Sequence, residues 1–212
     1  MSHQAAVRRE FPLDGFRVLP GRLDEAGQRA LLSELDNVIH RTPFFTPVMP
    51  RTGRAFSVVM TNLGPLGWVS DRAGYRYQAT HPVTAEPWPP SPDMVLDLWR
   101  AVSGYPHDPE ACLVNSYRAG AKMGLHQDSD EDEFAAPVVS ISLGDTAVFR
   151  IGGRERGGAT KSIRLASGDV LVMGGESRLC YHGIDRIMPG TSRLLPQGGR
   201  INLTLRRVTR PC

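Results

Sequence analysis

Two stretches in the first half of the chain carry apolar residues at the spacing of an amphipathic helix. In the first, residues 24–40, Asp24 suits the N-cap, and the apolar positions are Ala30, Leu31, Leu35, Val38 and Ile39. In the second, residues 91–102, Pro92 stands in the first turn, and the apolar positions are Met94, Val95, Leu98 and Trp99. The pattern predicts two helices, the first packed on a sheet.

Beyond residue 109 the pattern changes to short apolar runs separated by turns that contain glycine or proline. The runs are Cys112–Tyr117, Val138–Leu143, Ala147–Ile151, Ser162–Leu165, Asp169–Met173, Cys180–Ile184 and Ile201–Val208. Runs of this length and spacing favour antiparallel strands in a barrel or sandwich. Residues 43–92, rich in proline, glycine and aromatic side chains, indicate loops or hairpins.

Length and composition agree with one folded domain. The chain has 212 residues, of which 41% are hydrophobic, and this is enough for a single core. No apolar run approaches the roughly 20 residues needed to span a bilayer, and the amino terminus lacks the plan of a secretion signal. The three cysteines, Cys112, Cys180 and Cys212, form no CxxC pair. We expect a cytoplasmic protein with free thiols and no membrane partner.

The net charge of +3 is too small to indicate a polyanionic partner by itself, so the distribution of charge matters more. Four arginines lie close in sequence to three aromatic residues: Arg51, Arg54, Arg72 and Arg76 beside Trp68, Tyr75 and Tyr77. This mixture suits phosphates and stacked bases, and it equally suits a solvated surface with aromatic core anchors.

The triplet His126-Gln127-Asp128 places an imidazole and a carboxylate two residues apart, so both leave the same face of an extended segment. His182, at the end of another predicted strand, would complete a facial triad with open metal positions, as in non-haem iron(II) oxygenases. Other divalent metals accept these ligands, zinc foremost. The triplet also occurs in many proteins without metal, as hydrogen-bonded surface or core residues.

The last strand strengthens the metal hypothesis. Alternation over residues 200–206 places polar side chains on one face, Arg200, Asn202, Thr204 and Arg206. If the apolar face packs against a helix, two guanidinium groups lie inside the barrel, which is costly unless they pair with anions. A dicarboxylate bridging metal and arginine would supply that charge. The alternative is an exposed face with solvated arginines.

Taken together, these motifs resemble the AlkB family of iron(II)- and 2-oxoglutarate-dependent dioxygenases. The likeness rests on Asn115-Ser116-Tyr117, Gly120-Ala121-Lys122, His126-Gln127-Asp128, Pro137–Gly144, Gly168-Asp169-Val170, Gly174–Arg178, Tyr181–Ile184 and Arg200–Arg206. Their order and spacing match over about residues 110–208, and Gly67-Trp68 with Gly74-Tyr75 extend the match upstream.

The resemblance implies a mostly β fold, a double-stranded β-helix (jelly roll) with N-terminal helices and a nucleotide-recognition lid. We expect one catalytic domain over residues 1–212, with an N-terminal extension and the lid in about 1–105 and the jelly-roll core in about 106–212. The implied cofactor is iron(II), held by His126, Asp128 and His182, and the implied co-substrates are 2-oxoglutarate and dioxygen.

The resemblance also assigns the remaining site residues. Arg200, helped by Tyr117 and Asn202, would hold the distal carboxylate of 2-oxoglutarate, while Asn115 and Arg206 would steady the end near the metal. The positions matching substrate contacts in the family are Trp68, Tyr75, Asp130, Glu131 and Met173. Met173 stands where well-known repair members carry a large aromatic residue, which predicts a weaker or shifted base preference.

The implied activity is oxidative demethylation of N1-methyladenine and N3-methylcytosine in alkylated DNA, with RNA as a second substrate, by a monomeric repair enzyme. The products would be formaldehyde, succinate and carbon dioxide. A base in a duplex would have to be flipped out to reach the metal. Two alternatives stay open: the same oxygenase chemistry on a protein or small molecule, and a binding module that has kept the fold without catalysis.

Overall fold

The helices form where the hydrophobic pattern predicts them. The computed structural model describes residues 14–211. Helix α1 (Glu25–Ile39) begins after Asp24, whose side chain accepts a hydrogen bond of 2.8 Å from the Gly27 amide. Helix α2 (Asp93–Val102) begins after Pro92. Both predicted helices are confirmed, and within residues 14–211 neither has the length and apolar content of a membrane span.

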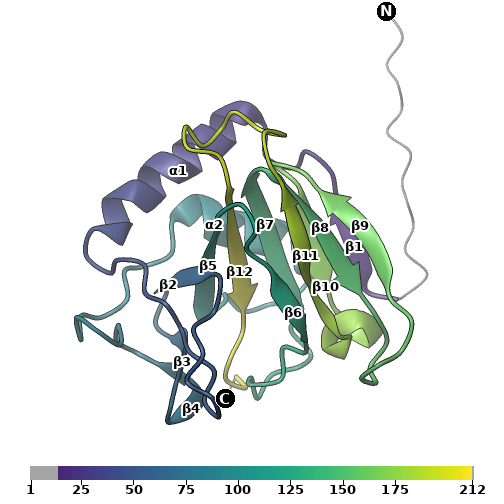
Figure 1. The fold of residues 1–212 in the computed structure, drawn as a ribbon, viewed down its shortest axis with the longest axis horizontal. Helices are drawn as coiled ribbons and strands as arrows, with labels where there is room; N and C mark the ends of the chain where they lie inside the picture. Colours follow the sequence, from purple (N-terminus) through teal and green to yellow (C-terminus); the bar gives the residue numbers. More distant parts are fainter. Residues whose placement is uncertain (1–13, 212) are drawn as a thin grey trace, which may run out of the picture.

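Two antiparallel sheets form the body of the fold (Figure 1). The larger sheet has six strands in the order β1 (Phe16–Leu19), β10 (Val170–Met173), β7 (Val138–Gly144), β12 (Arg200–Arg206), β5 (Ala111–Tyr117) and β2 (Val59–Leu63). The smaller sheet has four, in the order β6 (Met123–His126), β11 (His182–Met188), β8 (Thr146–Ile151) and β9 (Lys161–Leu165). Apolar side chains of both sheets meet between them, as a jelly roll requires.

The strands differ from the predicted runs in several places. The run predicted as Cys180–Ile184 begins as a strand only at His182, because residues 175–179 form the 3-10 helix η1, which is closed by the Cys180 amide bonding to the Ser177 carbonyl. Strands β1 and β6 lie outside the predicted runs, and β2 lies within residues 43–92, where the composition indicated loops or hairpins.

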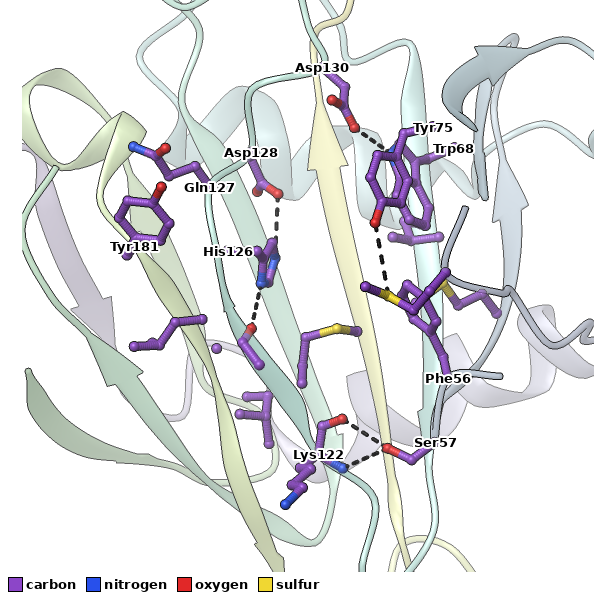
Figure 2. A pocket seen from close by; sticks show the side chains of 18 of the residues that line it. Phe56, Ser57, Trp68, Tyr75, Lys122, His126, Gln127, Asp128, Asp130 and Tyr181 are labelled. Atoms are coloured by element: carbon purple, nitrogen blue, oxygen red, sulfur yellow. Dashed lines mark hydrogen bonds and ion pairs between the residues drawn. The ribbon is translucent and has the colours of Figure 1, made fainter. Parts of the chain in front are cut away.

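A two-stranded hairpin forms a third sheet, with no strand paired to the other two sheets. Strands β3 (Gly67–Asp71) and β4 (Gly74–Gln78) pair with each other, with Trp68 directly opposite Tyr77. Figure 2 shows Trp68 and Tyr75 of this hairpin on the far side of β12 from His126. Residues 43–92 therefore do supply a hairpin, as their composition indicated, and it forms one wall of a cleft.

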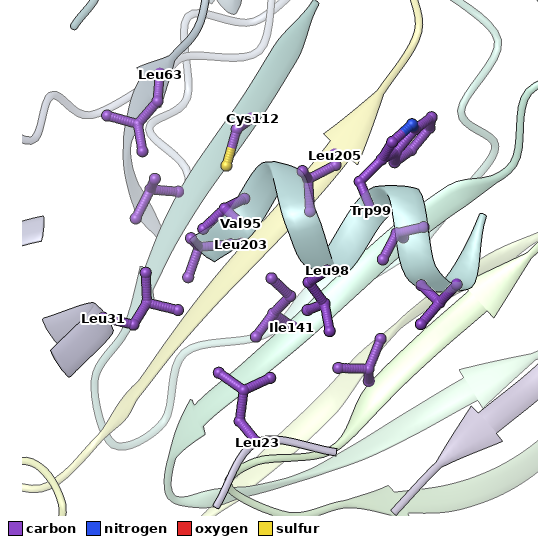
Figure 3. Close-up of a cluster of buried hydrophobic side chains, with 14 of the residues drawn as sticks. Leu23, Leu31, Leu63, Val95, Leu98, Trp99, Cys112, Ile141, Leu203 and Leu205 are labelled. Atoms are coloured by element: carbon purple, nitrogen blue, oxygen red, sulfur yellow. The ribbon is translucent and has the colours of Figure 1, made fainter. Parts of the chain in front are cut away.

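Both helices cover the outer face of the six-stranded sheet. The buried residues Leu31 of α1 and Val95, Leu98 and Trp99 of α2 belong to one apolar cluster with Leu203 and its neighbours (Figure 3). At about 25 cal/mol for each Å² of apolar surface removed from water, this layer accounts for a large share of the folding free energy. The helices thereby determine which face of β12 points inward.

Strand β12 has the two faces that its alternation predicted. Leu203 and Leu205 are fully buried in the helix-side cluster. Arg200 and Arg206 point to the other side, between the sheets, with exposed fractions of 1% and 6%. The alternative of solvated arginines is therefore wrong, because the apolar face is the one that the helices cover.

Replacing Leu203 with alanine is expected to lower the free energy of unfolding by about 2–5 kcal/mol, because it leaves a cavity under both helices. Urea unfolding followed by circular dichroism measures the change. Val83→Ala, at a position that is 77% exposed, is the control and should shift stability by less than about 0.5 kcal/mol. A loss no larger than that of the control would contradict the packing described for β12.

Candidate metal and co-substrate site

Three side chains from two distant segments meet where β6 pairs with β11. His126 ends β6 and His182 begins β11, and the two residues are direct partners in the strand register. Asp128 follows β6 by two residues. One ligand atom from each lies within 4.8 Å of the others, and the Nε2 atoms of both histidines are 3.7 Å from Asp128 carboxylate oxygens.

Each imidazole is oriented by a backbone carbonyl. The Nδ1 atom of His126 is 3.0 Å from the Gly124 carbonyl oxygen, and that of His182 is 3.0 Å from the Cys180 carbonyl oxygen. A carbonyl accepts only, so Nδ1 carries the proton in this arrangement and the Nε2 lone pair faces the triad. This is the tautomer that a metal ligand requires.

The charges at the triad also suit a divalent cation. Burial by itself would raise the pKa of Asp128, but Arg206, His182 and His126 outweigh it and lower the pKa, so the carboxylate is ionised. Burial, together with neighbouring His126, lowers the pKa of His182 to about 4, so this imidazole is neutral at physiological pH. Two imidazoles and one carboxylate form the His₂Asp donor set that iron(II) accepts.

Behind the triad lies a cavity of about 70 Å³, lined by Arg200, Arg206, Asn115, Tyr117 and other inward-facing residues of both sheets. The Arg200 guanidinium donates to the Ser142 hydroxyl at 2.7 Å and to the Leu165 carbonyl at 3.3 Å, and it forms no salt bridge within the described residues. Burial lowers its pKa to about 10, which still leaves it charged near neutrality. A buried cation without a carboxylate partner favours an anionic ligand.

Unpaired polar atoms concentrate at this site. Within residues 14–211, the buried side-chain nitrogen and oxygen atoms without a hydrogen-bond partner are Thr42 Oγ1, Asn115 Oδ1, Asp128 Oδ2, Arg200 Nε and Arg206 Nε. All but Thr42 belong to the triad or to the cavity behind it. An unsatisfied buried polar atom lowers stability by about 1–3 kcal/mol. Four such atoms at one site indicate that a bound ligand completes their interactions. A metal at Asp128 and a dicarboxylate at the arginines fit these atoms.

On the outer side of the triad a cleft of about 1130 Å³ opens to solvent. Its wall carries Trp68 and Tyr75, whose rings stack with centroids 5.6 Å apart and planes inclined by 17° (Figure 2). The Trp68 indole donates to Asp130 at 2.8 Å. The cationic residues on the rim are Arg54, Lys122, Arg150 and Arg156. His126 lines both the cleft and the inner cavity, so the triad lies at their junction.

Several assigned residues lie where their roles would require. The structure brings His126, Asp128 and His182 together. It places Asn115, Tyr117, Arg200, Asn202 and Arg206 around the inner cavity. It places Trp68, Tyr75 and Asp130 at the cleft. The amide of Asn202, however, donates to Ser140 and to the Ile141 carbonyl, so its donors serve the sheet.

Two residues assigned to substrate contacts are more deeply buried than Trp68 and Tyr75. Met173 is 1% exposed at the end of β10 and lines the inner cavity rather than the cleft, so its position gives no support to a contact with a base. Glu131 lines the cleft, but it is 4% exposed and its carboxylate is bound by Tyr77, Arg178 and Arg206.

Arg178 had no predicted role, and Tyr77 was named only among the aromatic residues close to arginines in the sequence. Arg178, in η1, donates to the backbone carbonyl of Asp128 at 2.7 Å and to that of Ala136 at 3.0 Å. It therefore holds together the two ends of the loop between Asp128 and Ala136. Tyr77 donates its hydroxyl to Glu131. The only signal in the sequence was that Arg178 lies within a matched motif.

Comparison with known proteins gives concordant results. The model of the 2OG-Fe(II) oxygenase superfamily matches residues 15–206. The alpha-ketoglutarate-dependent dioxygenase AlkB homolog of Caulobacter vibrioides is 55% identical over 193 residues, covering 91% of this chain and 87% of the relative. AlkB of Escherichia coli is 42% identical over 200 residues, covering 92% of each chain. The structure of OsALKBH1 superposes with a TM-score of 0.79 at 32% identity, covering 93% of this chain and 99% of that one.

Gly183→Ala is expected to weaken binding of a divalent metal by about tenfold or more, the range typical when ligand orientation is lost. A Cβ at Gly183 would lie 2.5 Å from the Met123 carbonyl oxygen, so β6, which carries His126, would be pushed away from β11. Titration with Co(II), followed by visible absorption, measures the affinity. Gly153→Ala is the control, since no atom lies within 4 Å of its Cβ position, and equal affinities in the two variants would contradict this geometry.

Proposed function

This chain belongs to the 2OG-Fe(II) oxygenase superfamily and to its AlkB group, and we propose that it oxidatively removes N-linked methyl groups from bases of alkylated nucleic acid. Family membership confirms the resemblance and makes the protein an iron(II)- and 2-oxoglutarate-dependent oxidoreductase that uses dioxygen. It also favours iron(II) over zinc. The observation that carries the substrate proposal is the position of the triad, at the junction of a buried cationic cavity and an open cleft with stacked aromatic rings.

In this proposal His126, Asp128 and His182 hold the iron. Asp128 offers Oδ2, which has no other partner, because Arg206 holds Oδ1 at 2.9 Å. Together, iron(II), 2-oxoglutarate and dioxygen supply the oxidising chemistry, and the protein supplies position and charge.

Arg200 binds the distal carboxylate of 2-oxoglutarate in the inner cavity. Burial, as the largest effect, raises the pKa of Tyr117 to about 12, so its phenol stays protonated and can donate to the same carboxylate. Arg206, which donates to Asp128, lies beside the triad, and Asn115, whose Oδ1 is unpaired, lines the same cavity. The enclosing sheets keep water from the co-substrate.

The cleft accommodates the nucleic acid. Trp68 and Tyr75 present ring faces on which a flipped base or its neighbour can stack, worth about 1–3 kcal/mol for each base. Arg54, Lys122 and Arg156 on the rim suit the phosphates on either side. Hydroxylation of the N-methyl carbon gives an N-hydroxymethyl group, which releases formaldehyde and a proton and leaves the ring nitrogen of the base unsubstituted.

The preferred lesions in this proposal are N1-methyladenine and N3-methylcytosine in DNA, with RNA as a second substrate. Both lesions disrupt Watson–Crick pairing, which lowers the cost of extruding the base. Repair of alkylated DNA by a monomer in the cytoplasm is the biological role that we propose.

The wild-type protein, supplied with iron(II), 2-oxoglutarate and air, is expected to release formaldehyde from oligonucleotides that contain either lesion and none from unmethylated controls. His126→Ala should abolish turnover, whereas His40→Ala, an exposed residue outside the site, should leave it unchanged. Succinate production that is not stimulated by any methylated oligonucleotide would favour the alternative, the same chemistry on a protein or small molecule. Activity retained in His126→Ala would remove this residue from the ligand set.

Arg200→Lys is expected to raise the KM for 2-oxoglutarate by about tenfold or more, because an ammonium cannot reproduce the planar, two-point recognition of a carboxylate. Steady-state succinate formation at varied 2-oxoglutarate concentration measures it. Arg186→Lys, a surface position with a side chain 65% exposed, is the matched control. An unchanged KM would place the distal carboxylate elsewhere.

A further inference from the structure

The five residues that follow β6, residues 127–131, include contacts to both the metal triad and the hairpin. Asp128 belongs to the triad. Asp130 accepts the Trp68 indole proton at 2.8 Å, and Glu131 accepts the Tyr77 hydroxyl proton. Trp68 and Tyr77 face each other across β3 and β4. One short segment therefore carries a candidate metal ligand and fixes a cross-strand pair of the cleft wall.

Two carboxylates of this segment are buried, Asp128 and Glu131, and only Asp128 is a candidate metal ligand. The burial of Glu131 therefore needs another explanation. Its side chain is 2% exposed, and its Oε2 accepts a hydrogen bond of 3.0 Å from Arg178. Its Oε1 is 3.4 Å from Arg206 Nε, an ion pair without a hydrogen bond. A buried carboxylate is tolerated only with such compensation, so Glu131 and the two arginines form one unit.

The same two arginines hold Asp128. Arg178 donates to its backbone carbonyl at 2.7 Å, and Arg206 donates to its Oδ1 at 2.9 Å. Oδ1 lies 3.7 Å from His126 Nε2 and also accepts from Arg206, whereas Oδ2 lies 3.7 Å from His182 Nε2 and has no hydrogen-bond partner. The two arginines thus fix the backbone and the carboxylate of Asp128 and leave Oδ2 unpaired beside the triad.

Charge explains why a second carboxylate is needed. Arg178, Arg206, Asp128 and Glu131 carry two positive and two negative charges within hydrogen-bond or ion-pair distance of one another. Without Glu131, two guanidinium charges would face the triad with Asp128 alone. In a site of low effective dielectric, that excess positive charge opposes the entry of a dication.

We propose that Glu131 is a positioning residue with two effects: it balances the arginines that present Asp128 to the metal, and through Tyr77 it fixes the hairpin that walls the cleft. The inference deepens the proposed function, since it rests on metal binding by the triad. In this proposal Glu131 acts through the two arginines and Tyr77 and is not a metal ligand.

The first experiment compares the Co(II) affinity of the wild type, Glu131→Gln and Glu133→Gln, with visible absorption as the readout. Glu131→Gln keeps the shape and removes the charge, and we expect about tenfold weaker binding and altered d–d bands. Glu133→Gln makes the same change two residues away, where the carboxylate accepts from the Ala135 amide, and should match the wild type. A folded Glu131→Gln protein with wild-type affinity and spectrum would overturn the proposal.

The second experiment tests the link to the hairpin with Tyr77→Phe, which removes one hydroxyl and no charge. We expect Co(II) affinity within about twofold of wild type, and binding of a fluorescent methylated oligonucleotide weaker by about threefold or more, because the hairpin loses a charge-assisted hydrogen bond. Tyr105→Phe is the control, since that phenol bonds to Glu133 instead.

Wild-type oligonucleotide affinity in Tyr77→Phe would overturn the role of Glu131 at the hairpin. This variant alone decides the proposal if Glu131→Gln does not fold.

The metal-site proposal and the positioning role of Glu131 are contradicted by different results. A wild-type protein that binds no Co(II) refutes the triad as a metal site and this proposal with it. Normal wild-type binding that Glu131→Gln leaves unchanged refutes only the positioning role.

Discussion

The constraint on which the rest of the structure depends is the orientation of β12. Leucines on one face of this strand pack under two helices, so the opposite face must lie between the sheets, although it carries Arg200 and Arg206. Burying two guanidinium groups is unfavourable unless anions accompany them. Arg206 obtains Asp128 and Glu131 from the protein, whereas Arg200 obtains only a hydroxyl and a carbonyl. Hydrophobic packing on the outer face of the sheet thus creates a requirement for negative charge on its inner face, which the co-substrate meets in the proposed function.

The triad depends on a second constraint, the close approach of β6 and β11. His126 and His182 occur 56 positions apart in the sequence, yet they are register partners whose rings lie 4.5 Å apart between centroids. The approach is possible because residue 183 has no side chain to hold the strands apart. Backbone carbonyls then set both tautomers, so the ligand geometry is specified before any metal binds.

Local sequence predicted a large part of this arrangement, because its signals are periodic. Alternation in residues 200–206 predicted both faces of β12, and two-residue spacing predicted that His126 and Asp128 act together. Contacts between distant segments left no such signal. Glu131 and Met173 were assigned to the substrate by likeness, yet the first is held by Tyr77 and Arg178 and the second lines the inner cavity. The start of β11 was predicted two residues too early, at Cys180, because Cys180 is apolar but caps the end of η1.

The structure divides chemistry and selectivity between different kinds of element. The inner cavity and both histidines belong to strands of the two sheets, whose hydrogen-bonded registers leave little freedom to vary. The cleft is walled by the hairpin β3–β4 and by connecting segments such as residues 49–57, which can change without disturbing those registers. In the proposed function, the oxidative step therefore depends on the sheets, and the choice of base or strand depends on the walls of the cleft. Because residues 128–131 join the two, a change in the cleft wall is transmitted to the metal through a carboxylate and two arginines rather than through the sheets.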